Sequence, residues 1–458
     1  MQPLTVPPGI SDYTATPMPA HRDDWEQRLL DDPDLLRDIA TAVDGPFHLM
    51  YPARVVRNIN AFQQVFAHTG IMGDIYYGKK ANKSPSVVRA CAKTGVGVDV
   101  SSCEEFRAAL RGGIGGTRLM VTGPAKSDRL LQMSATYGAL VAIDDLEELA
   151  RLTELGIPSR VVLRVLPPGS TSRFGMTDVE LALALTLTDP TAIRVEGFSF
   201  HLRGYEVAPR AELAAHLIGL CERARALGHD HATTISIGGG FRVDYVSAES
   251  WRTFLDGVNP RWFHGDRAHR PESFYPYHCP LPGPAMLAAV LAHDDLARRL
   301  RTASIRLAIE PGRALLDRAG CTVFRVQGVK VRHVQVPESA DVPYVILTVN
   351  GTSLSLSEQW FDSEYLPDPV LWPEYPGTLT PTCVGGSSCL EEDMLSRRRI
   401  PLPRAASTDD LLIYPNTAGY QMDSNESEFH ELGIPPKILL RKSPDGRQFL
   451  WTREPRDS

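Results

Sequence analysis

The stretch that decides the fold lies between residues 74 and 123 and alternates two kinds of pattern. Short β-type runs are DIYYGKK (74–80), GVDV (97–100) and RLMVTG (118–123), and between them lie SPSVVRACAKTG (84–95) and SCEEFRAALRGG (102–113). In the two longer segments apolar residues recur at intervals of three and four, and glycine stands at the end of each, as at helix C-caps. The stretch therefore predicts strand, helix, strand, helix, strand.

The same alternation continues on both sides of this stretch, from about Pro46 to Leu316. Further β-type runs cover residues 47–51, 140–144, 160–166, 195–202, 234–239 and 306–312. About eight such strand and helix units over roughly 250 residues are typical of a (β/α)₈ barrel, and a doubly wound open sheet is the competing architecture. We therefore predict an α/β TIM barrel over residues 46–316.

The remaining segments differ in composition from the barrel. Residues 317–458 contain strand-like runs separated by turns, which predicts a C-terminal β-rich domain of the sandwich or barrel-like kind. Residues 1–45 begin with many prolines and are predicted to form an N-terminal arm that packs on the β domain. The segment 247–284 is rich in aromatic residues, proline and histidine, and is predicted to be an insertion that lies over one end of the barrel.

Composition limits the classes of protein to which the chain can belong. The chain has 458 residues with 48 Lys and Arg against 55 Asp and Glu, a net charge of −7, which argues against a duplex nucleic-acid binder. No apolar run approaches the roughly 20 residues that span a bilayer, and the N-terminus does not resemble a secretory signal. The seven cysteines include no CxxC pair. We predict a cytoplasmic protein without nucleic-acid or membrane partners.

A pair of lysines ends one of the predicted barrel strands, in the sequence YYGKKAN (76–82). A lysine at the carboxyl end of a barrel strand points into the mouth where such enzymes place their active sites. Partial desolvation there would free the amine for Schiff-base chemistry. The alternative is that Lys79 and Lys80 only solvate the end of a strand.

Three consecutive glycines, Gly238, Gly239 and Gly240, follow the predicted strand TISI. Their backbone N–H groups can approach an anion without interference from Cβ atoms, and phosphate sites near the last strands recur in barrels. The alternative is an ordinary flexible turn. The sequence matches neither the G-x-G-x-x-G turn nor the G-x-x-x-x-G-K-[ST] loop of nucleotide-binding proteins.

The sequence EPGR places Glu310 and Arg313 three residues apart at the end of another predicted strand. The carboxylate can hold a protonated ring nitrogen while the guanidinium holds a phosphate, although a surface ion pair is the alternative. A lysine for an imine, a glycine loop for a phosphate and a glutamate for a pyridinium together describe pyridoxal 5′-phosphate.

In these motifs the sequence resembles the fold-type III pyridoxal-phosphate decarboxylases, which include the diaminopimelate and ornithine/arginine decarboxylases. The resemblance extends from about residue 45 to residue 430. The similar motifs occur in the same order as in that family: YGKKAN (77–82), GVGVDVSSCEEF (95–106), LRVLPP and SRFG within 163–175, FSFHLRG (198–204), SIGGGF (236–241), IEPGR (309–313), residues 389–393, AGY (418–420) and SEF (427–429).

The resemblance implies a role for each matching residue. Lys80 holds the internal aldimine, Glu310 keeps the pyridine nitrogen protonated, and His201 stacks on the ring. The other cofactor-binding residues that it implies are Arg164, Gly238, Gly239, Gly240, Gly312, Arg313 and Tyr420. Cys389 resembles the cysteine that crosses from the partner subunit to protonate the intermediate, which implies a homodimer with shared active sites. The implied activity is decarboxylation of a small-molecule amino acid.

The residues that would contact the substrate depart from the family pattern. The carboxylate that follows the cysteine in the family is replaced by Leu390, and the usual H-x-G-S reads His201, Leu202, Arg203, Gly204. We name Arg203, Leu390 and Asp393 as candidate substrate-binding residues and expect a substrate with an acidic or bulky, conjugated side chain.

Two other functions remain open at this stage. One is an amino-acid racemase or epimerase on the same barrel, and the other is a non-enzymatic carrier of pyridoxal phosphate. Alanine racemases as a family place an arginine against the pyridine nitrogen, whereas Glu310 stands here. The single-domain carriers lack the β domain. The histidines and cysteine of segment 247–284 match the spacing of no common zinc site, so no metal is predicted.

Overall fold

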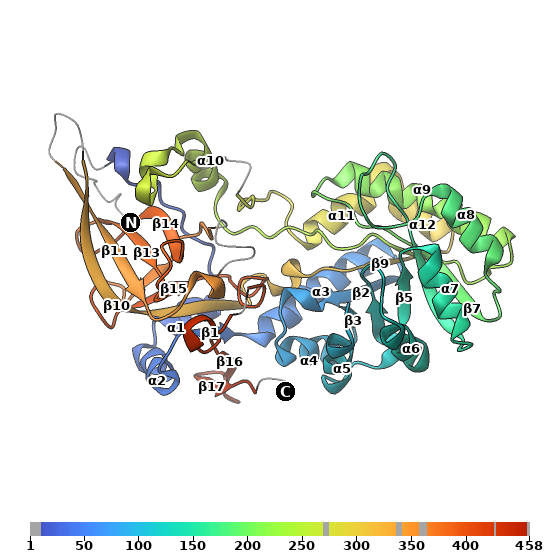
Figure 1. Ribbon diagram of the computed structural model, residues 1–458, viewed down its shortest axis with the longest axis horizontal. Helices are drawn as coiled ribbons and strands as arrows, with labels where there is room; N and C mark the ends of the chain where they lie inside the picture. The colour runs from blue at the N-terminus through green and yellow to red at the C-terminus, as the bar shows by residue number, and fades with distance from the viewer. Residues whose placement is uncertain (1–10, 269–273, 336–340, 357–363, 426, 456–458) are drawn as a thin grey trace. The chain divides into compact units, whose positions relative to one another are not determined.

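The computed structural model describes residues 11–268, 274–335, 341–356, 364–425 and 427–455 (Figure 1). These residues form two compact units. The first, called the barrel unit below, comprises residues 55–242 and 281–315. The second, called the β unit, comprises the described residues up to Arg54, residues 243–280 and the chain from Leu316 to Pro455.

The barrel unit contains the predicted closed barrel, which is thereby confirmed (Figure 1). The strand at residues 47–50, which the sequence assigned to the barrel, instead pairs with residues 320–323 in the sheet of the β unit. Its strands are all parallel, and β9 closes the ring by pairing with β2, with Gly73 opposite Leu307. Side chains from several strands fill the interior, among them Tyr76, Met120 and Val162. The barrel strands are β2 (Gly73–Gly78), β3 (Gly97–Val100), β4 (Leu119–Val121), β5 (Leu140–Ile143), β6 (Ser159–Arg164), β7 (Ile193–Ser199), β8 (Thr234–Ser236) and β9 (Arg306–Ile309).

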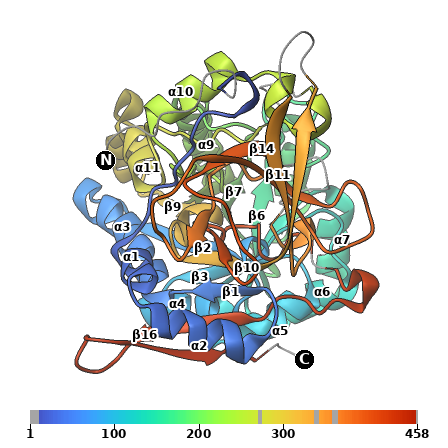
Figure 2. The same ribbon diagram turned by 90° about the vertical axis from the view of Figure 1, so that its left-hand side faces the viewer.

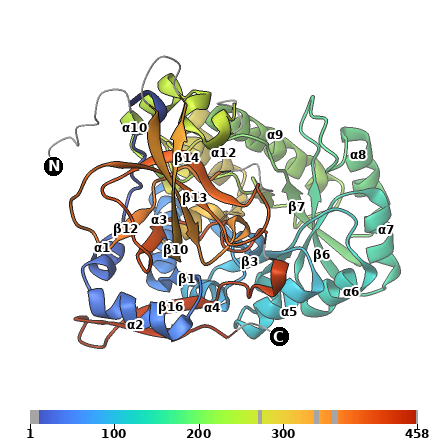
Figure 3. The same cartoon turned by 60° about the vertical axis from the view of Figure 1, so that its left-hand side comes forward.

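Helices surround this barrel, and Figure 3 shows α6, α7 and α8 outside β6 and β7. Within the described part of the chain, no helix is long and apolar enough to cross a bilayer. Helix α3 (Pro52–Thr69) leads into β2, and the helices of the barrel unit that connect its strands are α4 (Pro85–Thr94), α5 (Cys103–Arg111), α6 (Asp128–Tyr137), α7 (Leu146–Glu154), α8 (Asp178–Leu187), α9 (Val207–Ala226), α11 (Pro284–Ala292) and α12 (Leu296–Thr302).

Short polar side chains determine where several of these helices begin. Each of them accepts a hydrogen bond from a backbone N–H group two or three residues further on, which satisfies a donor that the first helical turn would otherwise leave unpaired. Because the first four of these caps follow closely after their strands, the carboxyl ends of β2, β3, β4 and β5 are joined to helices by compact loops. The capping residues are Ser84 for α4, Ser102 for α5, Ser127 for α6, Asp145 for α7 and Thr177 for α8.

The β unit is built on a mixed sheet, which confirms the predicted β-rich domain. Among the described residues the strand order is β14-β13-β11-β10-β1-β16-β17, with β15 on β10 and β12 on β15. Figure 2 shows the long strands β10 and β11 beside β14. The strands are β1 (Phe47–Met50), β10 (Gly320–Val334), β11 (Val342–Val349), β12 (Val370–Trp372), β13 (Thr380–Gly385), β14 (Met394–Leu402), β15 (Leu411–Tyr414), β16 (Lys437–Lys442) and β17 (Phe449–Arg453).

The N-terminal segment contributes two helices and the first strand to the β unit. Helices α1 (Asp24–Leu30) and α2 (Pro33–Val43) lie next to β1 and β16 in Figure 2. Trp25 of α1 and Ile39 of α2 are buried in one apolar cluster with Val323 of β10. The described part of this segment therefore contains regular, packed structure, whereas the sequence predicted only an arm.

The aromatic segment that the sequence assigned to the barrel belongs to the β unit as far as residue 280, and its position over one end of the barrel stays a prediction. The segment contains α10 (Ala248–Gly257). Phe254, Trp262 and Tyr277 are buried in a cluster that also contains Leu412 of β15. The composition that suggested a lid suits a packed core equally well, because large aromatic side chains bury the most apolar area.

Candidate active site

Two adjacent lysines follow β2, and they differ in accessibility. The short turn that contains both begins directly after the strand, so both lie at its carboxyl end. Lys79 is 4% exposed, whereas Lys80 is exposed. The charge of Lys80 acts on Asp99, His201 and Glu310, which come from three other strands. Lys80 is therefore the lysine of the pair that a ligand in the barrel mouth can reach.

Glu310 directly follows β9, and its carboxylate is bound by a neighbouring strand. The hydroxyl of Ser236 on β8 donates a hydrogen bond of 2.5 Å to Oε1. Burial raises the pKa of Glu310, while the Ser236 bond and the positive charges of Lys80, Arg164 and Arg210 oppose that shift. A carboxylate enclosed among cations in this way can accept a hydrogen bond from a protonated ring nitrogen.

A second carboxyl group, Asp99, belongs to the same cluster and was not named from the sequence. Asp99 lies on β3, is 4% exposed and accepts a hydrogen bond of 2.6 Å from Thr122 Oγ1. Burial raises its pKa to about 7, the charge of Glu310 adds to this, and Lys80 lowers it. The sequence signal was present, because Asp99 is the one charged residue in the apolar strand GVDV.

The three-glycine turn after β8 packs so closely that side chains have no room. Gly238 and Gly240 have φ angles of 68° and 81°. A Cβ atom at Gly238 would lie 2.8 Å from His201 Nδ1, and one at Gly239 would lie 2.7 Å from the carbonyl oxygen of Glu310. Only glycine fits here, and a bare turn of this kind is a cradle for an anionic group.

Arg210 of α9 supports this turn from behind and was also missed from the sequence. Its side chain is fully buried, and Nη1 donates to the carbonyl oxygens of Ile237 at 2.7 Å and of Gly239 at 2.8 Å. Burial lowers the pKa of Arg210 to about 10. Nothing in the helical pattern distinguishes this arginine from a surface residue, because its partners are backbone atoms distant in the sequence.

The EPGR segment lies beside the end of β2. The backbone N–H of Gly78 donates to the carbonyl of Pro311 at 3.2 Å. A Cβ atom at Gly78 would contact Gly312 Cα at 3.7 Å. Arg313 is half-buried and begins the short helical turn that follows. The segment therefore places Gly312 and Arg313 next to the strand that carries Lys80.

His201 follows β7 and is accessible at the barrel mouth. Although its ring can be reached, the surrounding protein desolvates the imidazolium and the charges of Lys80, Arg210 and Arg164 repel it, which lowers its pKa to about 4. A neutral imidazole is suited to lie flat against an uncharged or cationic ring. Arg203, two residues further on, is exposed, and no hydrogen bond or ion pair joins it to another residue in the described ranges.

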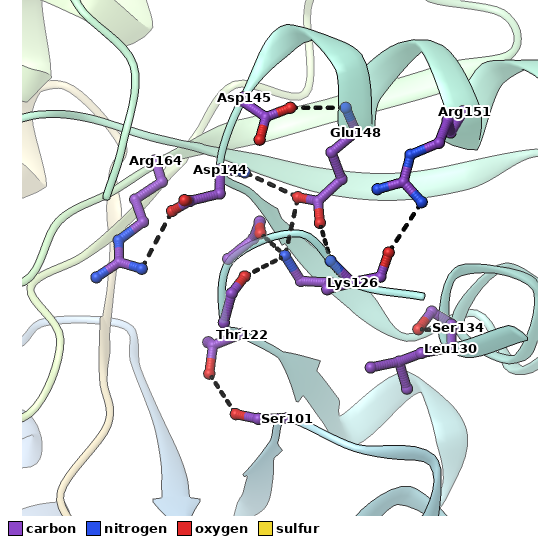
Figure 4. Close-up of polar contacts among 12 residues, drawn as sticks. Ser101, Thr122, Lys126, Leu130, Ser134, Asp144, Asp145, Glu148, Arg151 and Arg164 are labelled. Carbon is purple, nitrogen blue, oxygen red and sulfur yellow. Dashed lines mark hydrogen bonds and ion pairs between the residues drawn. The ribbon is translucent and has the colours of Figure 1, made fainter. Parts of the chain in front are cut away.

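Arg164 ends β6 and is held on two sides. Its Nη1 atom lies 3.2 Å from Asp144 Oδ1, as Figure 4 shows, and its guanidinium carbon lies 4.4 Å from the ring centroid of Phe174. Its charge acts on both Glu310 and His201. Arg164 therefore contributes positive charge to the cluster from a position set by Asp144.

The barrel unit thus brings together Lys80, Arg164, His201, the three glycines, Glu310, Gly312 and Arg313. The remaining candidates, Cys389, Leu390, Asp393 and Tyr420, lie in the β unit, and their membership of the site remains a prediction. The Sγ atom of Cys389 lies 3.2 Å from Nε2 of His430, and Leu390 is 37% exposed.

Asp393 has a different environment from its neighbours Cys389 and Leu390. It is 3% exposed, and its carboxylate accepts hydrogen bonds from the backbone N–H groups of Ser353 at 2.7 Å and Ser388 at 3.1 Å. These bonds connect two loops of the β unit. The contacts favour a structural role for Asp393 over substrate binding.

The barrel and the residues at the carboxyl ends of its strands define a class of protein, the barrel enzymes that bind pyridoxal phosphate. Residues 52–260 match the model of the pyridoxal-dependent decarboxylases, specifically their pyridoxal-binding domain. The chain belongs to the fold-type III pyridoxal-dependent decarboxylase family.

Relatives in sequence span nearly the whole chain. The uncharacterized protein y4yA of Sinorhizobium fredii is 36% identical over 432 residues, which cover 91% of this chain and 92% of the relative. A diaminopimelate decarboxylase of Actinosynnema pretiosum is 26% identical over 424 residues, covering 88% of this chain and 86% of that enzyme.

Solved structures share the fold at lower sequence identity. The diaminopimelate decarboxylase of M. jannaschii, in complex with L-lysine, has a TM-score of 0.72 and 17% identity, with 91% of each chain covered. The arginine decarboxylase of Paramecium bursaria Chlorella virus has a TM-score of 0.68 and 16% identity, covering 89% of this chain and 99% of the other. These likenesses support the two-part architecture.

Proposed function

We propose that the chain decarboxylates an amino acid or amino-acid derivative with pyridoxal 5′-phosphate held by the barrel unit. The observation that carries this proposal is the arrangement of Lys80, the glycine turn and Glu310 at the same end of the barrel. A reactive amine, an anion cradle and a buried carboxylate among cations are the groups that this cofactor requires.

The residues fit the cofactor in shape as well as in chemistry. Any side chain would fill the turn at Gly238 and Gly239, so the space there suits a phosphate bound by backbone N–H groups. Arg313 adds positive charge, and Tyr420 is proposed to complete the phosphate site. When bound, pyridoxal phosphate supplies an electron sink for the charge left at Cα as the carboxylate leaves.

The chain's own residues have distinct tasks in this proposal. Lys80 Nζ is the amine that would hold the cofactor in the absence of substrate. Glu310, as a carboxylate, holds a proton at the ring nitrogen. His201, neutral above a pH of about 4, covers one face of the ring and excludes water from it. An amino-acid racemase is disfavoured, since Glu310 stands where the alanine racemases as a family place an arginine.

Cys389 is proposed to reach the site of the partner subunit and to donate a proton to Cα, so that a homodimer contains two shared sites. The test is complementation between two inactive variants, Lys80→Ala and Cys389→Ala. After free exchange of equal amounts, half of the dimers are mixed and each has one intact site, so about a quarter of the wild-type activity should return. No return of activity, with exchange demonstrated by mass, would exclude the shared site.

The substrate is proposed to differ from the diamino acids. Leu390 cannot pair with a distal ammonium group, and an ammonium buried beside it would remain uncompensated. Arg203 is exposed and is a candidate partner for an acidic side chain. We further propose that the enzyme works in the cytoplasm.

Release of carbon dioxide across a panel of amino acids and their acidic or conjugated derivatives tests this function. We expect turnover of a substrate with an acidic or bulky side chain and poor turnover of ornithine, lysine and diaminopimelate. Arg203→Ala should raise KM for the preferred substrate while leaving kcat within a fewfold. Efficient turnover of a simple diamino acid, or a substrate preference unchanged in Arg203→Ala, would refute the proposed specificity.

A further inference from the structure

A buried ion pair lies behind the carboxyl ends of β4 and β5, outside the set of cofactor residues (Figure 4). Lys126 lies in the loop before α6, and Glu148 lies in the first turn of α7. Their side chains are 1% and 0% exposed, and Nζ lies 2.9 Å from Oε2. The sequence analysis gave neither residue a role.

Both side chains use their charged atoms to hold backbone groups. Nζ of Lys126 also donates to the carbonyl oxygens of Gly123 at 2.8 Å and Ala142 at 2.5 Å. The carboxylate of Glu148 accepts from the backbone N–H of Lys126 at 2.8 Å and from that of Asp144 at 2.9 Å. The pair therefore ties the ends of two adjacent strands to the start of α7.

Asp144 connects this pair to the site. Its backbone N–H is bound by Glu148, and its side chain lies 3.2 Å from Arg164 Nη1 (Figure 4). Arg164 in turn acts electrostatically on Glu310 and His201. A continuous chain of hydrogen bonds and ion pairs therefore runs from the buried pair to Arg164, whose charge acts on the cofactor cluster.

Stability alone does not account for a charged pair at this position. Burying two charges costs several kcal/mol per ion before their attraction returns it, and well-packed apolar side chains often do as well or better. An ion pair on the same side of the barrel, Arg151 with Asp128, is largely exposed, with Asp128 76% accessible. The buried pair is distinguished by what it holds, the backbone next to Asp144.

We propose that Lys126 and Glu148 are positioning residues that hold Asp144, and through it Arg164, at the end of the barrel where Glu310 and His201 lie. This inference rests on the proposed binding of pyridoxal phosphate. It assigns the pair a part in the active site although neither side chain touches the cofactor cluster.

The expected consequence follows from the groups that face Glu310. Lys80, Arg164 and Arg210 favour the carboxylate, as does the Ser236 hydrogen bond, and Asp99 opposes it. If Arg164 loses its position, one favourable charge is lost and the pKa of Glu310 rises. Cofactor binding that needs the carboxylate will then require a higher pH.

In the experiment, the Glu148→Gln variant is titrated with pyridoxal phosphate at pH values between 5 and 9 without substrate. Binding is monitored by visible absorbance. We expect affinity to fall by about tenfold or more near the acidic end, a loss in the range caused by small displacements of active-site groups. The loss of affinity should shrink at higher pH. In a plot of affinity against pH, the acidic limb should therefore move to higher pH. A crystal structure of the variant without cofactor should show Arg164 displaced from Asp144.

Two control variants separate positioning from simple destabilisation. Glu196→Gln breaks a partly buried ion pair at the opposite end of the same barrel, where Arg160 lies 2.7 Å from Glu196. It should lower Tm to a similar extent and leave the acidic limb in place. Asp128→Asn breaks the exposed pair next to α7 and should change neither quantity. An unmoved limb in Glu148→Gln, or an equal shift in Glu196→Gln, would overturn the proposal.

A second variant covers the case in which Glu148→Gln fails to fold. The double substitution Lys126→Met with Glu148→Leu leaves no unpaired buried charge and is expected to fold. It should show the same upward shift, and an unshifted limb would overturn the proposal. If the wild-type protein binds pyridoxal phosphate but neither variant shifts the limb, only this inference fails; if the wild type does not bind it, the proposed function fails.

Discussion

Acidic residues at the two ends of the barrel differ in the groups that surround them. At the amino end each acid has an arginine partner: Arg160 makes two bonds to Glu196, at 2.7 and 2.9 Å, and Arg306 lies 3.1 Å from Asp74. At the carboxyl end Asp99 and Glu310 are buried close enough to act on each other, and burial raises the pKa of both. Two buried acids that repel each other mark this end of the barrel as the one at which a ligand is expected to bind.

Shape alone would favour the end of the barrel opposite to the proposed site. A cavity of about 670 Å³ opens at the amino end, and Arg118, Arg160 and Arg306 are among its lining residues. None of the predicted cofactor residues lines it. The proposed site at the carboxyl end rests on the chemistry of its residues: an accessible lysine, a bare glycine turn and an enclosed carboxylate.

The largest difference between the ends should come from the lysine. Lys80→Ala should abolish both the visible absorbance of the bound cofactor and all decarboxylation, since no other group replaces the covalent anchor. Reduction of the wild-type protein with borohydride, followed by peptide mass spectrometry, should label Lys80. The control is Lys79→Ala, which keeps the accessible lysine and should still be labelled. A label on Lys79, or a covalent adduct in Lys80→Ala, would contradict the assignment.

A smaller but still large effect is expected at Glu310. Glu310→Gln should retain the cofactor yet lower kcat by about a hundredfold, or ~2.7 kcal/mol, because a neutral amide does not hold the proton at the ring nitrogen. Glu196→Gln is the matched change at the amino end, and it should affect Tm without lowering kcat to a comparable degree. Equal losses of kcat in the two variants would remove the functional contrast between the ends.

The sequence was sufficient for the architecture and for the residues carried by local motifs. Alternating strand and helix patterns predicted the barrel, because each element is specified by its own periodicity and caps. Lys80, the glycine turn and Glu310 each stand directly after a strand, where parallel strands of a barrel must deliver them to one end. These residues could therefore be placed together before any coordinates were known.

The residues that the sequence did not reveal act through distant partners. Arg210 binds carbonyl groups near residue 238, and Glu148 binds the backbone at positions 126 and 144, so neither contact leaves a local pattern. The packing of the aromatic segment 247–284 was missed for a related reason. Its composition predicts burial, but composition does not say against which sheet the aromatic rings pack, and they proved to belong to the core of the β unit.

The smallest predicted effect concerns stability and the acid that conflicts with Glu310. The pKa of Asp99 is about 7 in the folded protein against an ordinary value of 3.8, so between about pH 4 and pH 7 the folded state binds more protons than the unfolded state. Stability of the cofactor-free protein should therefore fall as pH rises through that window.

The variant Asp99→Asn tests this expectation. It removes the pH-dependent contribution of Asp99 to stability, while its amide oxygen can still accept a hydrogen bond from Thr122. Above pH 7 its Tm should exceed that of the wild type by about 2–4 °C, and the difference should vanish toward pH 4. Asp74→Asn, at the amino end, loses an ion pair with Arg306 and should gain no stability at any pH. Parallel curves of Tm against pH for Asp99→Asn and the wild type would mean that ionisation of Asp99 does not destabilise the folded protein. The contrast between the two ends of the barrel would then be lost.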